Sequence, residues 1–314
     1  MEEQVKEKKK GIKHALFEIY DKKYRLLLLI PFIVLFLALA QIGYQIHKTG
    51  DFINRDVSLK GGVTVTIPLN KDIDSGKIQS EISNKFPGHD VAVRTLKGTG
   101  AVVGVIVEAD IDGNDKAQIQ SLLSAISGSL EMNLKKGDYG IEVVGSSLGE
   151  SFFRESLIAL AVAFIFMGLV VLAYFRTLVP SMAIILAAFS DMVIALAVIN
   201  LMGVRIGTSG IAAFLMLIGY SVDTDILLSV RVLKRREGTV MDRIISSIKT
   251  GMTETITAIV AVTVAMIVTQ SSVIKQIMLI LLIGLFADIL NTWIQNVGIL
   301  RIYVERKAKK GVII

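Results

Sequence analysis

Residues 157–175 read LIALAVAFIFMGLVVLAYF, a stretch without a charged side chain. A helix of about 20 apolar residues is long enough to cross the hydrocarbon core of a bilayer, so this stretch predicts a membrane span. Similar runs occupy residues 26–46, 180–202, 206–230, 252–269 and 274–300. The sequence therefore predicts an α-helical membrane bundle of six transmembrane helices.

The composition agrees with a membrane location. Of the 314 residues, 53% are hydrophobic and 20% are charged, which is more apolar surface than a soluble domain of this length can cover. The formal net charge is +6, but the Lys and Arg residues lie beside the apolar runs, without the aromatic interleaving that is typical of nucleic-acid-binding motifs. We therefore expect membrane lipid, and no nucleic acid, among the partners.

Sequence motifs for metal, cofactor or catalytic sites are missing. The chain has no cysteine, and His14, His47 and His89 are too scattered for a metal site. Residues 60–63 lack the pattern of a nucleotide-binding loop. Residues 145–149 satisfy the G-x-S-x-G pattern of a hydrolase, but they lead into a membrane span instead of an α/β sheet. We expect no metal, no cofactor and no enzymatic activity.

The first apolar run has a second interpretation. Ala38-Leu39-Ala40 resembles the small-residue cleavage site of a signal peptide. However, a charged leader over residues 1–25 and a full-length apolar run over residues 26–46 are more typical of an uncleaved anchor. We therefore treat the run as a transmembrane helix.

The distribution of basic residues predicts the orientation. Lys and Arg are concentrated in the N-terminal segment 1–25, the loop 231–250 and the tail 301–314, whereas the opposite short loops contain little beyond Arg205 and Lys275. Basic flanks stay in the cytoplasm, so both termini are predicted to be cytoplasmic in a protein of the cell membrane. Six spans place all three basic segments on that same side.

An extracytoplasmic domain is predicted between the first two spans, over residues 47–153. Its strand patterns cover residues 62–67, 91–94, 101–107 and 141–144, and its amphipathic helices cover residues 75–86 and 116–132. Residues 97–100 are predicted to form a hairpin turn. The order βαββαβ predicts a ferredoxin-like α+β domain, with residues 154–300 forming transmembrane helices two to six.

Short motifs along the chain point to one family. Asp56-Val57-Ser58-Leu59-Lys60-Gly61-Gly62 precedes the outer segment, and Val144-Gly145-Ser146-Ser147-Leu148-Gly149 follows it. The third span contains Ser190-Asp191-Met192-Val193, and the fourth contains Ile218-Gly219-Tyr220-Ser221-Val222-Asp223-Thr224-Asp225, followed by Arg231. These stretches resemble the outer-domain entry and exit, the His-Asp-Val motif and the Gly-Tyr-Ser-x-Asn-Asp signature of the SecF family, in the resistance-nodulation-division superfamily.

The resemblance covers nearly the whole chain and implies a function. It implies an auxiliary subunit of Sec-dependent protein export, with a SecD-like protein, the Sec translocon channel and translocating polypeptides as partners. It also implies that protonmotive force is coupled to substrate movement. Two alternatives stay open: a small-molecule exporter protomer of the same superfamily, and a membrane scaffold that transports nothing.

Two departures from the bacterial SecF pattern bear on the mechanism. Thr224 stands where that pattern has its acid, while Asp223 falls at the position that SecD uses. Glu254, before Thr255, stands where the bacterial pattern has an arginine. The pattern is more similar to the archaeal branch, so the bacterial proton-exchange scheme does not transfer unchanged.

The candidate proton or ion relay consists of acids inside the predicted spans, because a carboxylate there costs a few kcal/mol or more. Asp191 shares a helix face with three alanines, and Asp288 precedes Asn291 and Gln295 in a polar stripe. Both patterns also fit acids that only pack helices together.

The fourth and fifth spans contribute three more candidates. Asp223 and Asp225 lie about 200° apart on a regular helix and cannot serve one site. We favour Asp223, which stacks over Gly219, and we expect Glu254 near the cytoplasmic end of span five, in reach of water. Because no basic residue is expected at this depth, the acids are either protonated or paired with a cation from a partner.

Overall fold

The computed structural model describes residues 20–71, 73–97, 102–235 and 237–309. Within them, six helical segments are long and apolar enough to cross a membrane: Tyr24–Thr49, Ser146–Phe175, Leu178–Leu201, Thr208–Lys234, Val240–Val268 and Ser272–Lys309. Most of the predicted N-terminal segment, the last residues of the tail and the turn at Gly98, Thr99 and Gly100 lie outside the described residues.

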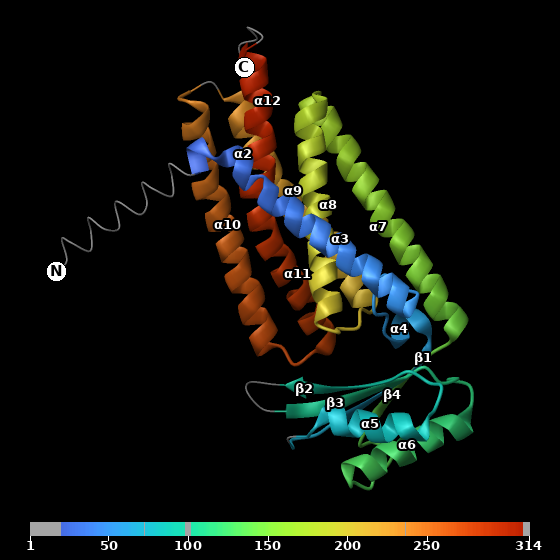
Figure 1. The fold of residues 1–314 in the computed structure, drawn as a ribbon. Coiled ribbons are helices and arrows are strands. Elements are labelled where there is room, and N and C mark those ends of the chain that lie inside the picture. The colour runs from blue at the N-terminus through green and yellow to red at the C-terminus, as the bar shows by residue number, and fades with distance from the viewer. Residues whose placement is uncertain (1–19, 72, 98–101, 236, 310–314) are drawn as a thin grey trace, which may run out of the picture.

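The helices of the bundle differ in how much they are covered. The first segment comprises α2 (Tyr24–Leu27) and α3 (Leu29–Thr49). The helices α8 (Leu178–Leu201) and α9 (Thr208–Lys234) are buried over more than half of their most apolar windows, whereas few residues are buried in those of α7 (Ser146–Phe175) and α10 (Val240–Val268). Figure 1 shows α7 and α10 at opposite edges of the bundle. The interior is thus formed around α8, α9 and the last segment.

The last segment is not a uniform α-helix. It begins as α11 (Ser272–Leu290), continues as a π-helix, η1 (Asn291–Asn296), and ends as α12 (Val297–Lys309). A π-helix forms i→i+5 hydrogen bonds and often occurs at functional positions. The apolar run 274–300 predicts a span and does not reveal this change of helix type.

The outer domain follows the predicted order of elements. The strands are β1 (Gly62–Pro68), β2 (Val91–Lys97), β3 (Val102–Ala109) and β4 (Gly140–Val144), and the helices are α5 (Ser75–Lys85) and α6 (Lys116–Leu130). The four strands form an antiparallel sheet in the order β2-β3-β1-β4. Asp74 and Asp115 accept hydrogen bonds from the first backbone N–H groups of α5 and α6, which explains where both helices begin.

The two faces of the sheet have different surroundings. Alternate residues such as Val65 and Val107, which are paired across β1 and β3, point into the apolar core under α5 and α6. The intervening residues, such as Thr64 and Glu108, point to the other face, which lies toward the bundle (Figure 1). The period of two along each strand therefore separates an apolar core from a polar surface beside the membrane part.

Two spans begin earlier than predicted. The helix α7 starts at Ser146, directly after β4, inside the segment predicted as the outer domain. The helix α10 starts at Val240, where Thr239 and Asp242 form a capping box, so most of the predicted loop 231–250 is helical. Hydropathy marks only the apolar part of a helix, and both helices have polar first turns outside that part.

Candidate functional site

Three carboxyl groups meet inside the bundle. Asp191 on α8 and Asp225 on α9 have 0% of their surface exposed, and Asp288 on α11 has 1%. The three side chains interact electrostatically with one another. We call Asp191, Asp225 and Asp288 the acid cluster.

The acid cluster is held by uncharged hydrogen-bond donors. The Ser221 hydroxyl donates to Asp191 Oδ2 over 2.5 Å, and Asn291 Nδ2 donates to Asp191 Oδ1 over 2.7 Å. The remaining bonds run from Asn296 Nδ2 to Asp225 Oδ1 over 2.7 Å and from Thr292 Oγ1 to Asp288 Oδ1 over 2.9 Å. None of the ion pairs found between described residues involves these acids. Among the described residues, no Lys or Arg therefore forms an ion pair with the acid cluster.

The π-helix carries side chains that reach two neighbouring helices. Asn291 binds an acid of α8, and Asn296, five residues later, binds an acid of α9. Both asparagines, together with Thr292 and Gln295, are fully buried. The polar stripe predicted from Asp288, Asn291 and Gln295 omits Thr292 and Asn296. Their spacing of four and eight residues from Asp288 places them on the same face of a helix, so the signal was available in the sequence.

Several oxygen atoms around the acid cluster lack a donor. They are buried and without a hydrogen-bond partner, and they comprise Asp225 Oδ2, Asn291 Oδ1, Asn296 Oδ1 and Gln295 Oε1. A protonated carboxyl group has one O–H donor, whereas an ionised one only accepts. An O–H group of a protonated carboxyl would give one of these acceptors a donor.

The two aspartates of α9 lie on different faces, as their spacing predicts. Asp225 is in the acid cluster, whereas Asp223 is exposed on the outside of the bundle. Gly219 lies one turn before Asp223, and a Cβ atom placed on it would meet no atom within 4 Å. Asp223 therefore lies apart from the acid cluster, and its role in a relay stays a prediction.

The other motif residues of α9 have structural contacts. Ser221 belongs to the acid cluster through its bond to Asp191, and Tyr220 is exposed on the outside of the helix. Arg231 donates to the Ser246 carbonyl oxygen over 2.7 Å and to Thr250 Oγ1 over 2.9 Å, which joins the end of α9 to α10. Arg231 thus fixes two helices and does not enter the cluster.

Glu254 lies near the middle of α10. It is exposed, the helix begins 14 residues before it, and it interacts electrostatically with Asp288. Its place near the cytoplasmic end of the apolar run 252–269 stays a prediction. Glu254 lies outside the acid cluster and close to it.

The outer-domain motifs form the junction with the membrane part. Asp56 caps the short helix α4 (Val57–Lys60) by accepting from Ser58 N over 2.9 Å. Gly61 has a φ of 87° and Gly62 has a φ of 133°, which strongly favour glycine. A Cβ atom on Gly149 would lie 2.9 Å from the Lys60 carbonyl carbon, so the first turn of α7 packs directly on the backbone after α4. Gly145 lies between β4 and α7, and a Cβ atom placed on it would meet no atom within 4 Å.

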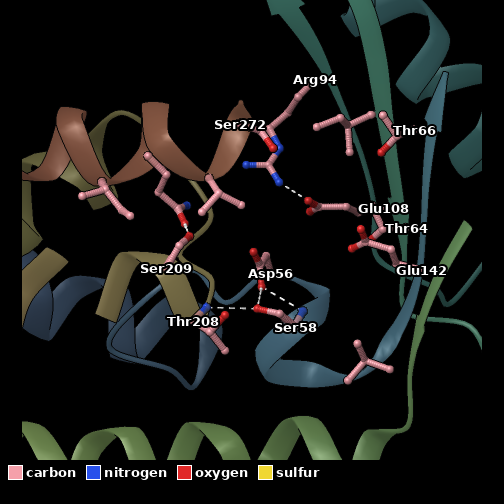
Figure 2. A pocket seen from close by; sticks show the side chains of 15 residues that line it. Asp56, Ser58, Thr64, Thr66, Arg94, Glu108, Glu142, Thr208, Ser209 and Ser272 are labelled. Carbon is pink, nitrogen blue, oxygen red and sulfur yellow. Dashed lines mark hydrogen bonds and ion pairs between the residues drawn. The ribbon is translucent and has the colours of Figure 1, made fainter. Parts of the chain in front are cut away.

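A polar cleft separates the sheet from the bundle (Figure 2). It has a volume of about 530 Å³, and Thr208 and Ser209 of α9 face Thr64, Thr66 and neighbouring sheet residues across it. The lining of the cleft includes the ion pair between Arg94 and Glu108. Burial lowers the pKa of Arg94 from its ordinary value.

An ion pair between Asp90 and Arg205 connects the outer domain to the bundle. Asp90 accepts from Arg205, in the loop between α8 and α9, over 2.6 Å and lies 3.3 Å from Lys60 Nζ. Partial burial alone would raise the pKa of Asp90, but the charges of Arg205 and Lys60 outweigh it and lower that pKa. Sequence patterns identify neither Asp90 nor the cleft, because the residues that meet there are distant in the sequence.

The fold and the acid cluster define a class: a multi-pass membrane protein with an α+β domain inserted after its first span and carboxyl groups inside its bundle. Residues 126–306 match the family described as "Protein export membrane protein SecD/SecF, C-terminal". The chain is 36% identical over 307 residues to the protein-export membrane protein SecF of Pyrococcus furiosus, covering 98% of this chain and 97% of that protein. It is also 36% identical to the SecF of Methanothermobacter thermautotrophicus, over 90% of this chain and 94% of that one. The chain belongs to the SecD/SecF family.

Solved structures of SecDF have a similar fold. The SecDF of Thermus thermophilus matches with a TM-score of 0.68 at 18% identity, covering 90% of this chain. A second SecDF structure, in a form called super-membrane-facing, matches with a TM-score of 0.53 at 17% identity. The match covers 38% of each SecDF chain.

Proposed function

We propose that this chain is an auxiliary subunit of Sec-dependent protein export that works with a SecD-like partner beside the translocon channel. The names of its relatives and the likeness to SecDF support this proposal. The likeness to SecDF, in which the match covers 38% of the chain, also supports a SecD-like partner. The further partners are the translocating polypeptide and membrane lipid.

The membrane arrangement belongs to the same proposal. Residues 1–25, the connection after α9 and the C-terminal tail are cytoplasmic, in line with their positive charge. The domain between α3 and α7 is extracytoplasmic and ferredoxin-like, which is supported by its βαββαβ order and its sheet order β2-β3-β1-β4. In this position it can hold a polypeptide that emerges from the channel.

The acid cluster carries the proposal that protons drive this work. Three carboxyl groups share one buried site whose donors are all uncharged, so the loss of one proton would leave a charge that the described surroundings do not neutralise. A rearrangement of α8, α9 and η1 would then relieve that charge. Proton binding and release are thereby coupled to helix movement.

The test uses the chain and its SecD-like partner reconstituted in vesicles. An imposed proton gradient should drive proton uptake, which a dye inside the vesicles reports. The triple variant Asp191→Asn, Asp225→Asn and Asp288→Asn keeps size and hydrogen bonding but cannot ionise, so it should abolish both uptake and gradient-stimulated export. Normal gradient-stimulated export by the triple variant would end the proton-coupling proposal.

A scaffold without a transport cycle is the second candidate. It is favoured by one observation: each acid of the cluster already has a hydrogen-bond partner within this chain. A scaffold predicts no proton uptake in the wild type and tolerance of the triple variant. Uptake that depends on the three aspartates would exclude it, and uptake coupled only to small-molecule efflux would favour an exporter.

A further inference from the structure

One backbone carbonyl of the π-helix is bonded from outside the helix. At the end of η1, the Val297 N–H donates to the carbonyl oxygen of Thr292, five residues earlier, and to that of Ile294. In a regular α-helix this N–H would bond the carbonyl four residues earlier, which belongs to Trp293. The Trp293 carbonyl oxygen instead accepts from the Tyr20 hydroxyl over 2.6 Å. Tyr20 thus supplies the donor that the π geometry withdraws from this carbonyl.

The segment that carries Tyr20 is bound along one side of α12. Asp21 accepts from Arg301 over 2.8 Å, and the Tyr24 hydroxyl donates to Glu305 Oε2 over 2.7 Å. Arg301 and Glu305 lie one turn apart on α12, and the Arg301 guanidinium lies 4.1 Å from the centre of the Tyr24 ring. Figure 1 shows α2 next to α12 at the end of the bundle opposite the outer domain. These contacts anchor the segment, whereas the bond from Tyr20 acts on the backbone of η1.

The π geometry aims two asparagines at one site. Asn291 donates to Asp191 of α8. Asn296 donates to Asp225 of α9, and both acids belong to the acid cluster. Side chains five residues apart point about 140° apart on an α-helix, whereas the i→i+5 bonds of a π-helix place them about one turn above each other. An α-helical segment could therefore not keep both bonds.

The turn that Tyr20 reaches is packed on two sides. The Trp293 side chain is 5% exposed, and a Cβ atom placed on Gly251 of α10 would overlap its indole ring. A Cβ atom placed on Gly298, at the start of α12, would overlap the side chain of Leu28. If the Tyr20 hydroxyl is removed, the nearest donor that the carbonyl can regain is the N–H four residues later, and that bond requires the α form.

We propose that Tyr20 is a positioning residue for the acid cluster. Its bond to the Trp293 carbonyl holds residues 291–296 in the π form. That form in turn keeps Asn291 and Asn296 on their acids. A part for Tyr20 in proton binding rests on the proposed function, but the bond and its effect on the acid cluster do not. The segment before the first span is thereby connected to the interior of the bundle.

The first measurement observes the carbonyl itself in the full chain, reconstituted in vesicles. The chain has a single tryptophan, so tryptophan labelled with ¹³C at its carbonyl carbon marks residue 293 alone. Isotope-edited infrared spectroscopy follows the stretching band of that carbonyl. Tyr20→Phe should shift the band, because the hydroxyl donor is lost. The matched control Tyr24→Phe removes a hydroxyl of the same segment that bonds to the Glu305 side chain, and it should leave the band unchanged.

The second measurement follows the acid cluster. A lipid-soluble carbodiimide reacts with carboxyl groups, and mass spectrometry gives the rate at which Asp225 is modified, with the exposed Asp223 as the internal reference. Asn296→Ala removes the donor to Asp225 directly and should raise this rate. Tyr20→Phe should raise it at least threefold, and combining it with Asn296→Ala should add nothing, because both changes remove the same bond. Tyr24→Phe should leave the rate at its wild-type level.

The outcomes separate positioning from anchoring. An unshifted band in Tyr20→Phe, or a shifted band with an unchanged rate at Asp225, would overturn the inference. Equal effects of Tyr20→Phe and Tyr24→Phe on that rate would assign them to a loosened segment and would overturn it too. Melting experiments set a temperature at which both variants are folded. If the triple aspartate variant keeps gradient-stimulated export, the proton-coupling proposal fails, while the effect of Tyr20 on the acid cluster stands.

Discussion

The bond between Asn296 and Asp225 offers a measurement of the protonation state of the acid cluster. Asn296 Nδ2 donates to Asp225 Oδ1 over 2.7 Å between two buried side chains. A hydrogen bond between neutral groups of transmembrane helices contributes about 0.6 kcal/mol on average and at most about 1.7 kcal/mol. A bond to an ionised group contributes about 1.5–3 kcal/mol. The size of the coupling therefore distinguishes a protonated from an ionised Asp225.

We expect a coupling free energy of about 0.6–1 kcal/mol from the cycle of Asn296→Ala, Asp225→Ala and the double variant, because the O–H group of a protonated Asp225 would give one of the unpaired acceptors a donor. Unfolding of each protein is followed in mixed micelles with increasing SDS. The chain has a single tryptophan, and Trp293 lies within the π-helix with 5% of its surface exposed, so its fluorescence reports the loss of packing at this site.

The control is Asn200→Ala, which removes another buried asparagine whose Nδ2 donates over 2.9 Å to the uncharged carbonyl oxygen of Phe52. Its cost should not change with pH. A coupling above about 2 kcal/mol between positions 225 and 296, or one that grows from about pH 6 to about pH 8, would show an ionised Asp225 and refute the reasoning.

Four other predictions address the outer domain and its junction with the bundle. A fragment of residues 62–144 should give a circular dichroism spectrum of mixed helix and strand, because its core is formed within the domain; a disordered spectrum would contradict this. A cysteine at Asp110 should react with an impermeant thiol reagent in intact cells, and labelling only after permeabilisation would reverse the topology. The Asp90–Arg205 pair should be present at neutral pH and weaken only as pH falls through the lowered pKa of Asp90. Because the Asp90 side chain is 43% exposed, Asp90→Asn should lower the free energy of unfolding by about 1 kcal/mol or less. A small increase in the protease sensitivity of the junction would report this loss. Gly149→Leu should instead destabilise the whole protein in a melting experiment, since the added side chain would meet the backbone at Lys60.

The sequence predicted the elements of this fold well because their signals are local. Apolar length identified the spans, and the period of two identified strands such as Gly62–Pro68 within a residue or two. The starts of α7 and α10 were predicted too late, because polar first turns such as that at Ser146 carry no hydropathy signal. The capping box of α10, formed by Thr239 and Asp242, was visible in the sequence but was not used.

The site was harder to predict because it depends on how helices rotate against one another. Helical periodicity separated Asp223 from Asp225 correctly, but the side of α9 that faces inward follows from packing against α8 and η1. The period of 3.6 places Asn296 on the face of Asp288, but it does not reveal that residues 291–296 form a π-helix or that Asn296 reaches Asp225 of α9.

The contact between Gly61 and the start of α7 has a consequence for how such chains can change. The strand that enters the outer domain and the strand that leaves it are neighbours in the sheet, paired from Gly62 to Val144, so the two ends of the domain emerge side by side. An insertion whose ends lie together can be enlarged, shortened or exchanged without moving the helices that flank it. The outer domain is thus a replaceable module, and grafting a different domain between residues 61 and 146 should leave the membrane bundle able to assemble.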